Sequence, residues 1–352
     1  MKLISLPSSS YTLTPEYGGH RNQIHRSTYL GSVGSGEVTV TPKEMYSLSQ
    51  IRKGIKWGLE SPSLVFREAN RVYYGVRKGF DYNHDGTAVL DEDWDTLIVL
   101  DACRYDMFCE ESTFSGPIEK RQSRGSHTSQ FIRGNFDGRT LHDVVYTNGS
   151  PQLEKRRDEI DVEFHAVSNI WNSSRWNDDV GTILPEDMTD AAIEAHQEYP
   201  NKRHIVHYMQ PHYPFLGSDI NRGTNWKERG RFDLWDQLIR GRYEVSPEKV
   251  WNAYRETLRR ALPAVQELLD EIDGRVVVTS DHGNMIGERA SPIPVKEWGH
   301  PIGIYTDELV TVPWNVHDDG TRREIKAERP QSSENSVEDT VVTDRLQDLG
   351  YV

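Results

Sequence analysis

Two short segments of this 352-residue chain place carboxylates just after apolar runs, where they could bind a cation. Asp101 follows the run 96–100, and Asp281 and His282 come just after the run 275–279. Two carboxylates held together without a cation would repel each other, whereas carboxylate oxygens and imidazole nitrogens are accepted ligands of divalent metals. These residues predict a metal site, provided that the fold brings both runs together. Asp101 taken alone could equally cap a following helix.

Two further histidines and an arginine could hold an anionic ester beside such a metal. His212 comes soon after the apolar run 204–209, between two prolines, and His300 follows a glycine. Their imidazoles could stabilise charge on the ester or assist its leaving group, although His212 could instead be a packed loop residue. Arg104 could pair with an ester oxygen or form an ion pair with Asp106.

The elements that must position these residues are strands and helices in alternation. The runs 96–100, 204–209 and 275–279 are short and apolar, which is typical of strands buried on both faces of a parallel sheet. Helices are predicted at 186–198 and at 246–272, the second with a capping serine and a proline in its first turn. The order predicts an α/β fold, a doubly wound, mostly parallel sheet flanked by helices. In such sheets the carboxyl ends of the strands line the ligand crevice.

The order of these segments resembles the alkaline phosphatase–sulfatase superfamily, in particular its sulfatase-like branch. The resemblance covers roughly residues 90–315, and the ending 346–351 also looks like that branch. It is carried by Leu97-Ile98-Val99-Leu100-Asp101, Pro211-His212-Tyr213-Pro214-Phe215, Thr279-Ser280-Asp281-His282-Gly283, and Gly299-His300-Pro301 before Val312-Pro313-Trp314. The resemblance implies an alkaline phosphatase-like fold and a metal-dependent enzyme that hydrolyses or transfers a phosphate or sulfate ester through a hydroxyl nucleophile.

The resemblance places the nucleophile in the stretch 123–131. Aligned with the family pattern Cys/Ser/Thr-x-Pro-Ser-Arg/His, Ser126 takes the nucleophile's position, Thr128 stands where proline is usual, and Gln130 stands where Arg or His is usual. These departures favour a plain alkoxide over the aldehyde hydrate of formylglycine sulfatases, and they leave Thr128 as a rival nucleophile. The stretch could also do no more than cap a helix. Binding to a divalent cation would lower the pKa of the hydroxyl.

The resemblance further implies one divalent ion, with the ligands Asp101, Ser126, Asp281 and His282. The mixed set of oxygen and imidazole ligands suits Mn, Zn or Mg, and Ca would suit a true sulfatase. Many relatives carry an acid where this chain has Gln210, so a second ion is less favoured, although two metals stay open. His212, His300 and Arg104 are then the expected substrate ligands.

The net charge and the composition limit the partners and the compartment that we expect for this protein. A net charge of −14 argues against nucleic acid and repels anionic substrates at long range. A small-molecule, glycan-linked or lipid-linked anionic ester would therefore need the local positive charge of a metal. The sequence contains no apolar run of about 18 residues, so we expect no membrane span. Two cysteines and no recognisable signal peptide predict a cytoplasmic protein. The sequence leaves the oligomeric state open.

The predicted catalytic core spans 91–316. Within it, the charged and aromatic segment 217–245 is either a cap over the substrate or a surface excursion. Residues 1–90 are expected to form an arm with helices that pack on the core, and 317–352 to form a linker and a docking segment. Two other functions stay open: a formylglycine-type sulfatase, and a catalytically inactive binding or scaffolding protein of the same fold.

Overall fold

The computed structural model of the protein describes residues 62–220, 233–318, 320–330 and 337–351. Seven strands form its main sheet, in the order β2-β11-β8-β1-β7-β3-β4. Their bounds are β1 Thr96–Leu100, β2 Ile118–Gln122, β3 Arg139–Asn148, β4 Val162–Asn169, β7 Arg203–Tyr208, β8 Arg275–Ser280 and β11 Thr311–Asp318. The five strands from β8 to β4 pair in parallel, and β11 pairs antiparallel with β8 and β2. The mostly parallel sheet predicted from the apolar runs is confirmed.

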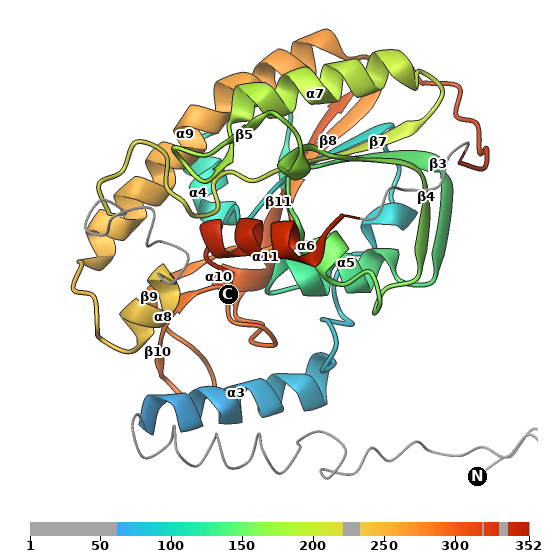
Figure 1. Ribbon diagram of the computed structural model, residues 1–352. Helices are drawn as coiled ribbons and strands as arrows, with labels where there is room; N and C mark the ends of the chain where they lie inside the picture. The colour runs from blue at the N-terminus through green and yellow to red at the C-terminus, as the bar shows by residue number, and fades with distance from the viewer. Residues whose placement is uncertain (1–61, 221–232, 319, 331–336, 352) are drawn as a thin grey trace, which may run out of the picture. The chain divides into compact units, whose positions relative to one another are not determined.

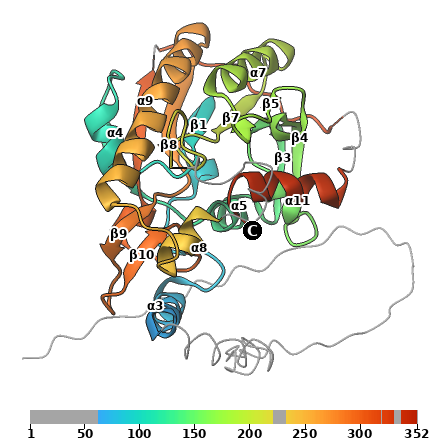
Figure 2. The same cartoon turned by 60° about the vertical axis from the view of Figure 1, so that its left-hand side comes forward.

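Helices cover both faces of this sheet (Figures 1 and 2). α7 Pro185–Glu198 and α9 Pro247–Glu271 lie side by side over one face, and α5 Thr128–Phe136 packs on the other. The side chains of β1 alternate between the two apolar clusters beneath these helices. Because successive side chains of a strand point to opposite faces, a strand that is apolar throughout must be covered on both. The arrangement is the predicted doubly wound α/β fold.

The helix predictions from capping and periodicity are also confirmed. α7 and α9 begin within a residue or so of the predicted starts at 186 and 246. The Ser246 side chain accepts a hydrogen bond from the backbone N–H of Lys249 at 3.2 Å, so it satisfies an N–H group that the first turn leaves unpaired. Pro263 lies inside α9.

Two further helices lie at the ends of the described chain, and the remaining elements are shorter. The longer two are α3 Pro62–Lys78 and α11 Asp339–Asp348. The short ones are η1 Val89–Asp91, α4 Tyr105–Glu111, α6 Gln152–Lys155, η2 Ile170–Asn172, β5 Trp176–Asn177, β6 Thr182–Ile183, α8 Leu234–Ile239, β9 Met285–Arg289, β10 Lys296–Gly299 and α10 Asp307–Val310. β9 and β10 form an antiparallel pair.

Contacts divide the chain into the units 1–50 and 51–352, and all described residues belong to the second. The predicted helical positions Ile51, Ile55 and Leu59 lie outside the described residues. The segment 217–245 is described at both ends and includes α8. Leu346, on α11, is buried in the main apolar cluster. None of the described helices combines the length and the apolar character that crossing a membrane requires.

Candidate metal centre

Asp101 and Asp281 lie next to each other at the carboxyl ends of two paired strands. The last residue of β1, Leu100, pairs with Ser280 of β8, so the residues that follow emerge side by side. Both carboxylates are fully buried. Asp281 Oδ1 accepts hydrogen bonds from the backbone N–H groups of Ala102 and His282, each at 2.9 Å. These bonds fix one oxygen of Asp281 and leave the other free to face Asp101.

A buried histidine completes this cluster. Potential ligand atoms of Asp101, His207 and Asp281 all lie within 4.8 Å of one another. His207 Nε2 is 3.8 Å from Asp101 Oδ2 and 3.9 Å from Asp281 Oδ2. Its Nδ1 lies 2.8 Å from the Tyr146 hydroxyl, and a proton on Nδ1 leaves the lone pair of Nε2 directed at the carboxylates. Burial lowers the pKa of His207 to about 4, so the ring is the neutral form that a metal needs.

Three atoms of this cluster lack a hydrogen-bond partner within the described part of the chain: Asp101 Oδ1, His207 Nε2 and Asp281 Oδ2. A buried polar atom without a partner costs free energy, and two such carboxylates also repel each other. Burial and the charge of Asp281 raise the pKa of Asp101 well above its usual value. A divalent cation among these atoms would satisfy all three and offset the repulsion, so the residues fit a metal.

His282 adds a second imidazole. Its Nε2 is 3.4 Å from Asp281 Oδ2 and 3.6 Å from Asp101 Oδ1. Its Nδ1 lies 2.9 Å from the carbonyl oxygen of Gly283, which fixes the proton on the side away from the carboxylates. The structure thus brings together Asp101, Asp281 and His282, and it adds His207.

The two candidate nucleophiles lie in different surroundings. The Thr128 hydroxyl is 3.4 Å from Asp101 Oδ2 and 3.2 Å from His282 Nε2. The Ser126 hydroxyl lies 2.9 Å from both Gln130 Oε1 and the carbonyl oxygen of Pro301, and it accepts the N–H of Gly303. In the described structure no hydrogen bond joins Ser126 to the carboxylate cluster. Thr128 is therefore the hydroxyl that the structure places beside the ligand atoms.

The first turn of α5 explains this difference. The helix begins at Thr128, and the preceding His127 caps it by accepting the N–H of Ser129 on Nδ1 at 3.0 Å. The capping interpretation of this stretch is thus also correct, because one turn caps the helix and presents a hydroxyl. The positive end of the helix dipole at this start favours an anion.

The histidines predicted to face the substrate lie against His282. The ring centroids of His300 and His282 are 4.8 Å apart, and those of His212 and His300 are 4.9 Å apart. Burial lowers the pKa of His212 to about 3 and that of His300 well below its usual value, with neighbouring imidazoles adding to the effect. Asn284 Oδ1 lies 2.9 Å from His300 Nδ1 and can orient its ring. Both rings are neutral near pH 7. Nδ1 of His212 faces the carbonyl oxygen of Tyr213 and Nδ1 of His300 faces Asn284 Oδ1, so the single proton of each ring lies on Nδ1 and Nε2 carries a lone pair.

Arg104 donates from its guanidinium to the carbonyl oxygen of Asn284 at 3.2 Å, next to this cluster of imidazoles. Its guanidinium bonds Asp106 at 2.9 and 2.5 Å and Glu288 at 2.5 Å. It also stands over the ring of Trp251, 4.8 Å from the centroid. The structure therefore shows the ion pair with Asp106 that was the alternative to an ester contact. Gln210 bonds the carbonyl oxygen of Ile183 at 2.8 Å.

Tyr351 reaches the site from the last segment of the described chain. Its hydroxyl lies 3.1 Å from Asp101 Oδ2 and 3.2 Å from the Thr128 hydroxyl, and its ring stacks on His212 with centroids 4.7 Å apart. The backbone N–H of Tyr351 bonds the carbonyl oxygen of Leu346, which anchors the segment to α11. Sequence reasoning marked the ending 346–351 as part of the resemblance and of an expected docking segment, and it missed this contact.

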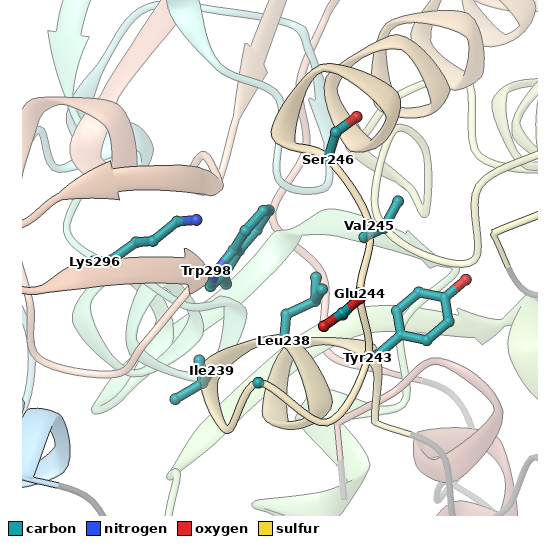
Figure 3. Close-up of a pocket in the computed structure, with 9 residues that line it drawn as sticks. Leu238, Ile239, Tyr243, Glu244, Val245, Ser246, Lys296 and Trp298 are labelled. Atoms are coloured by element: carbon teal, nitrogen blue, oxygen red, sulfur yellow. The ribbon is translucent and has the colours of Figure 1, made fainter.

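A hollow of about 550 Å³ lies near the histidines, between α8, β10 and the chain that leads into α9 (Figure 3). Its lining mixes apolar and polar groups, with one charge of each sign, and includes Leu238, Tyr243, Val245, Trp298, Glu244 and Lys296. Trp235, one helical turn before Leu238, has its ring centroid 6.4 Å from that of His300. The hollow therefore lies within a few side chains of the site.

No family model matches the chain, and no curated protein sequence matches it. Similar solved structures include the C-terminal periplasmic domain of a phosphoethanolamine transferase from Campylobacter jejuni, with 14% identity, 64% of this chain and 78% of that chain covered, and a TM-score of 0.38. The soluble domain of a lipooligosaccharide phosphoethanolamine transferase from Neisseria meningitidis has 11% identity, coverage of 63% and 75%, and a TM-score of 0.39. A phosphonate monoester hydrolase from Silicibacter pomeroyi has 13% identity, coverage of 65% and 68%, and a TM-score of 0.35.

These neighbours are members of the alkaline phosphatase–sulfatase superfamily, the family that the motifs of this chain resemble. Their identities and TM-scores are low, so the likeness is distant and carries no conclusion about activity. Evidence for the function comes from the geometry of the carboxylates, imidazoles and hydroxyls of this chain.

Proposed function

We propose that this protein is a metal-dependent enzyme that hydrolyses or transfers a phosphate ester, with Thr128 as its nucleophile. The observation that carries the proposal is the position of the Thr128 hydroxyl. It lies 3.4 Å from Asp101 and 3.2 Å from His282, beside buried ligand atoms without partners. A threonine hydroxyl is a weak nucleophile unless its pKa is lowered, and a divalent cation held by such a cluster would lower it.

Asp101, Asp281 and His282 would hold one divalent ion, with His207 and the Thr128 oxygen completing the set. When bound, the ion would lower the pKa of the hydroxyl and offset charge on the ester oxygens. Two carboxylates and two imidazoles suit Zn or Mn better than Mg, which prefers oxygen ligands and keeps several waters.

Side chains of the protein would carry out the remaining steps of the reaction. The Thr128 oxygen would attack phosphorus opposite the leaving oxygen, forming a new P–O bond as the bond to the organic group breaks. The Thr128 proton would be lost to water as the bound ion lowers the pKa of the hydroxyl, and Nε2 of His212 or His300 would take up a proton and give it to the leaving oxygen. Water or an acceptor hydroxyl would then release the phosphoryl group. The hollow beside Trp298 is where we place the organic part of the substrate, small or linked to a glycan or lipid.

The nature of the nucleophile favours phosphate over sulfate chemistry of the formylglycine type. Formylglycine forms from a residue whose Cβ carries no second carbon. Thr128 carries a methyl group there, so oxidation of its hydroxyl would give a ketone and not the aldehyde. A formylglycine sulfatase would need Ser126 in that role, and the Ser126 hydroxyl is bound by Gln130, Pro301 and Gly303.

A matched set of hydroxyl variants tests the proposal. Wild type, Thr128→Ala, Thr128→Ser and Ser126→Ala would be assayed on aryl phosphates, phosphodiesters and sulfates with Mn, Zn, Mg or Ca. We expect Thr128→Ala to lose at least about 10³-fold in kcat/KM, Thr128→Ser to keep part of it, and Ser126→Ala to stay active. Peptide mass spectrometry should find a trapped phosphoryl group on residue 128.

Two results would count against this assignment. An inactive Ser126→Ala with an active Thr128→Ala would move the nucleophile to Ser126. No turnover by a wild-type protein that binds metal would favour the inactive binding protein of the same fold.

A further inference from the structure

Five buried imidazoles lie around the carboxylates and the candidate nucleophile, and the nitrogen that carries the proton determines what each ring can do. They are His127, His207, His212, His282 and His300. In four of them, all except His127, Nδ1 lies at an oxygen atom of another residue and can donate its proton there. Because a neutral ring holds one proton, these four rings keep only a lone pair on Nε2.

His127 differs from the other four, because its Nδ1 accepts a hydrogen bond. The backbone N–H of Ser129 donates to this atom at 3.0 Å, and the Ser129 hydroxyl lies 2.9 Å from it. A backbone N–H can only donate, so this contact requires a lone pair on Nδ1, and the single proton of the ring is then on Nε2. Within the described part of the chain, no hydrogen bond uses this N–H group.

The ring of His127 lies among the side chains that surround the nucleophile. Its centroid is 5.1 Å from that of His300, 5.3 Å from that of Tyr351 and 6.1 Å from that of His282. His282 and Tyr351 both lie 3.2 Å from the hydroxyl of Thr128, the residue that follows His127. The unused N–H group therefore belongs to the site, where the oxygens of an ester attacked by Thr128 would lie.

Capping of α5 does not by itself account for a histidine at this position. Asn, Asp, Ser and Thr are the preferred N-cap residues, because their short side chains accept N–H groups of the first turn. His127 does this with a buried ring that is surrounded by other imidazoles. The cap also has a second effect, since it fixes the form of the ring that carries its proton on Nε2.

We propose that His127 is a further catalytic residue, whose Nε2–H donates a hydrogen bond to a non-bridging oxygen of the phosphate ester. The inference rests on the proposed function, and it supplies a donor that His212 and His300 lack. A fixed N–H group stabilises the negative charge on these oxygens in the transition state of the attack by Thr128. The proton stays on Nε2 throughout, because Nδ1 remains bound to the N–H of Ser129.

Two amide substitutions separate the donor role of His127 from its capping role. An Asn amide can take the place of Nδ1 and a Gln amide that of Nε2, so His127→Asn keeps the cap acceptor and His127→Gln keeps an N–H donor. On an aryl phosphate with Zn or Mn, we expect His127→Asn to lose about 10²–10³-fold in kcat/KM, mainly in kcat, and His127→Gln to recover part of this loss. Thermal unfolding should give the opposite order, with the Asn variant more stable than the Gln variant.

His317→Asn is the matched control, because His317 pairs with Val276 near the start of β8, at the edge of the sheet opposite Asp281. It should leave kcat/KM unchanged. Binding of orthovanadate to the zinc-loaded protein, measured by calorimetry, needs no turnover. His127→Asn should weaken this binding at least about tenfold while the affinity for Zn stays the same.

The inference is overturned if His127→Asn keeps the activity of the wild type, if His127→Gln is no more active than His127→Asn, or if His127→Asn releases the metal. These results would leave the proposed function intact, because that function is tested by the loss of activity in Thr128→Ala. An inactive wild type would contradict the proposed function, and equal vanadate binding by the wild type and His127→Asn would overturn this inference as well.

Discussion

Replacing Asp281 by Asn should stabilise the metal-free protein and at the same time remove most of its response to metal. Asp281 is fully buried, and its Oδ1 accepts two backbone N–H bonds of 2.9 Å, from Ala102 and His282. The amide oxygen of Asn can keep both bonds. Its NH₂ group would replace Oδ2, which has no partner among the described residues, and could donate to Asp101 or His207.

The magnitude follows from the spacing of the cluster. Ligand atoms of Asp101 and Asp281 lie within 4.8 Å of each other, and two charges at that distance repel by about 3 kcal/mol at an effective dielectric constant of about 20. Part of this repulsion is already relieved, because burial and Asp281 raise the pKa of Asp101 and favour its protonated form. We therefore expect Asp281→Asn to add about 1–2 kcal/mol to the metal-free unfolding free energy, or about 2–4 °C in Tm.

Thermal unfolding after chelation, and again after titration with Zn or Mn, measures both effects. At a free metal concentration of about 100 times Kd, the wild type should gain about 2.7 kcal/mol. The variant should lose most of this gain, because an anionic ligand is gone. Asp91→Asn is the matched control. The Asp91 side chain is 61% exposed and pairs with Arg139, so its replacement should change stability by no more than about 0.5 kcal/mol.

Either of two results would refute this reasoning. A metal-free Asp281→Asn protein that is clearly less stable than the wild type would mean that the second oxygen of Asp281 has favourable partners. An equal metal-induced gain in both proteins would mean that Asp281 is not a ligand.

Three further substitutions address the remaining site residues. His207→Ala should weaken metal binding by at least about tenfold in calorimetry, and unchanged affinity would limit His207 to a structural role. Tyr351→Phe removes the hydroxyl beside Asp101 but keeps the ring, so kcat should fall by about tenfold with little change in KM. Tyr199→Phe, at the end of α7, is its control, and equal effects of both would exclude a role of Tyr351 in the reaction. His300→Ala should lower kcat/KM by about 10²–10⁴-fold while the metal stays bound, and metal loss would make His300 a ligand.

Much of the fold could be predicted because it depends on local patterns. Buried parallel strands need continuous apolar residues, which residues 96–100, 204–209 and 275–279 supply. Helix starts depend on capping side chains such as Ser246. Because the carboxyl ends of parallel strands share one edge of the sheet, these local patterns are enough to predict a metal site around Asp101.

His207 escapes sequence reasoning for a reason that lies in strand geometry. It belongs to a run whose apolar pattern indicates only a strand, and its side chain points to the face that α5 covers. Neighbouring positions such as Val206 and Tyr208 point to the other face. An imidazole next to the end of a buried strand was the available signal.

The sequence by itself determined the α/β architecture, the strand ends and the residue types that can hold a metal. Only the tertiary structure decided which hydroxyl meets them. Ser126 and Thr128 are two residues apart, and the start of α5 turns the second toward Asp101 and the first toward Gln130. Tyr351 is 250 residues from Asp101 in sequence, and its contact depends on how the final segment packs. Such choices depend on long-range packing, which no local pattern in a single sequence records.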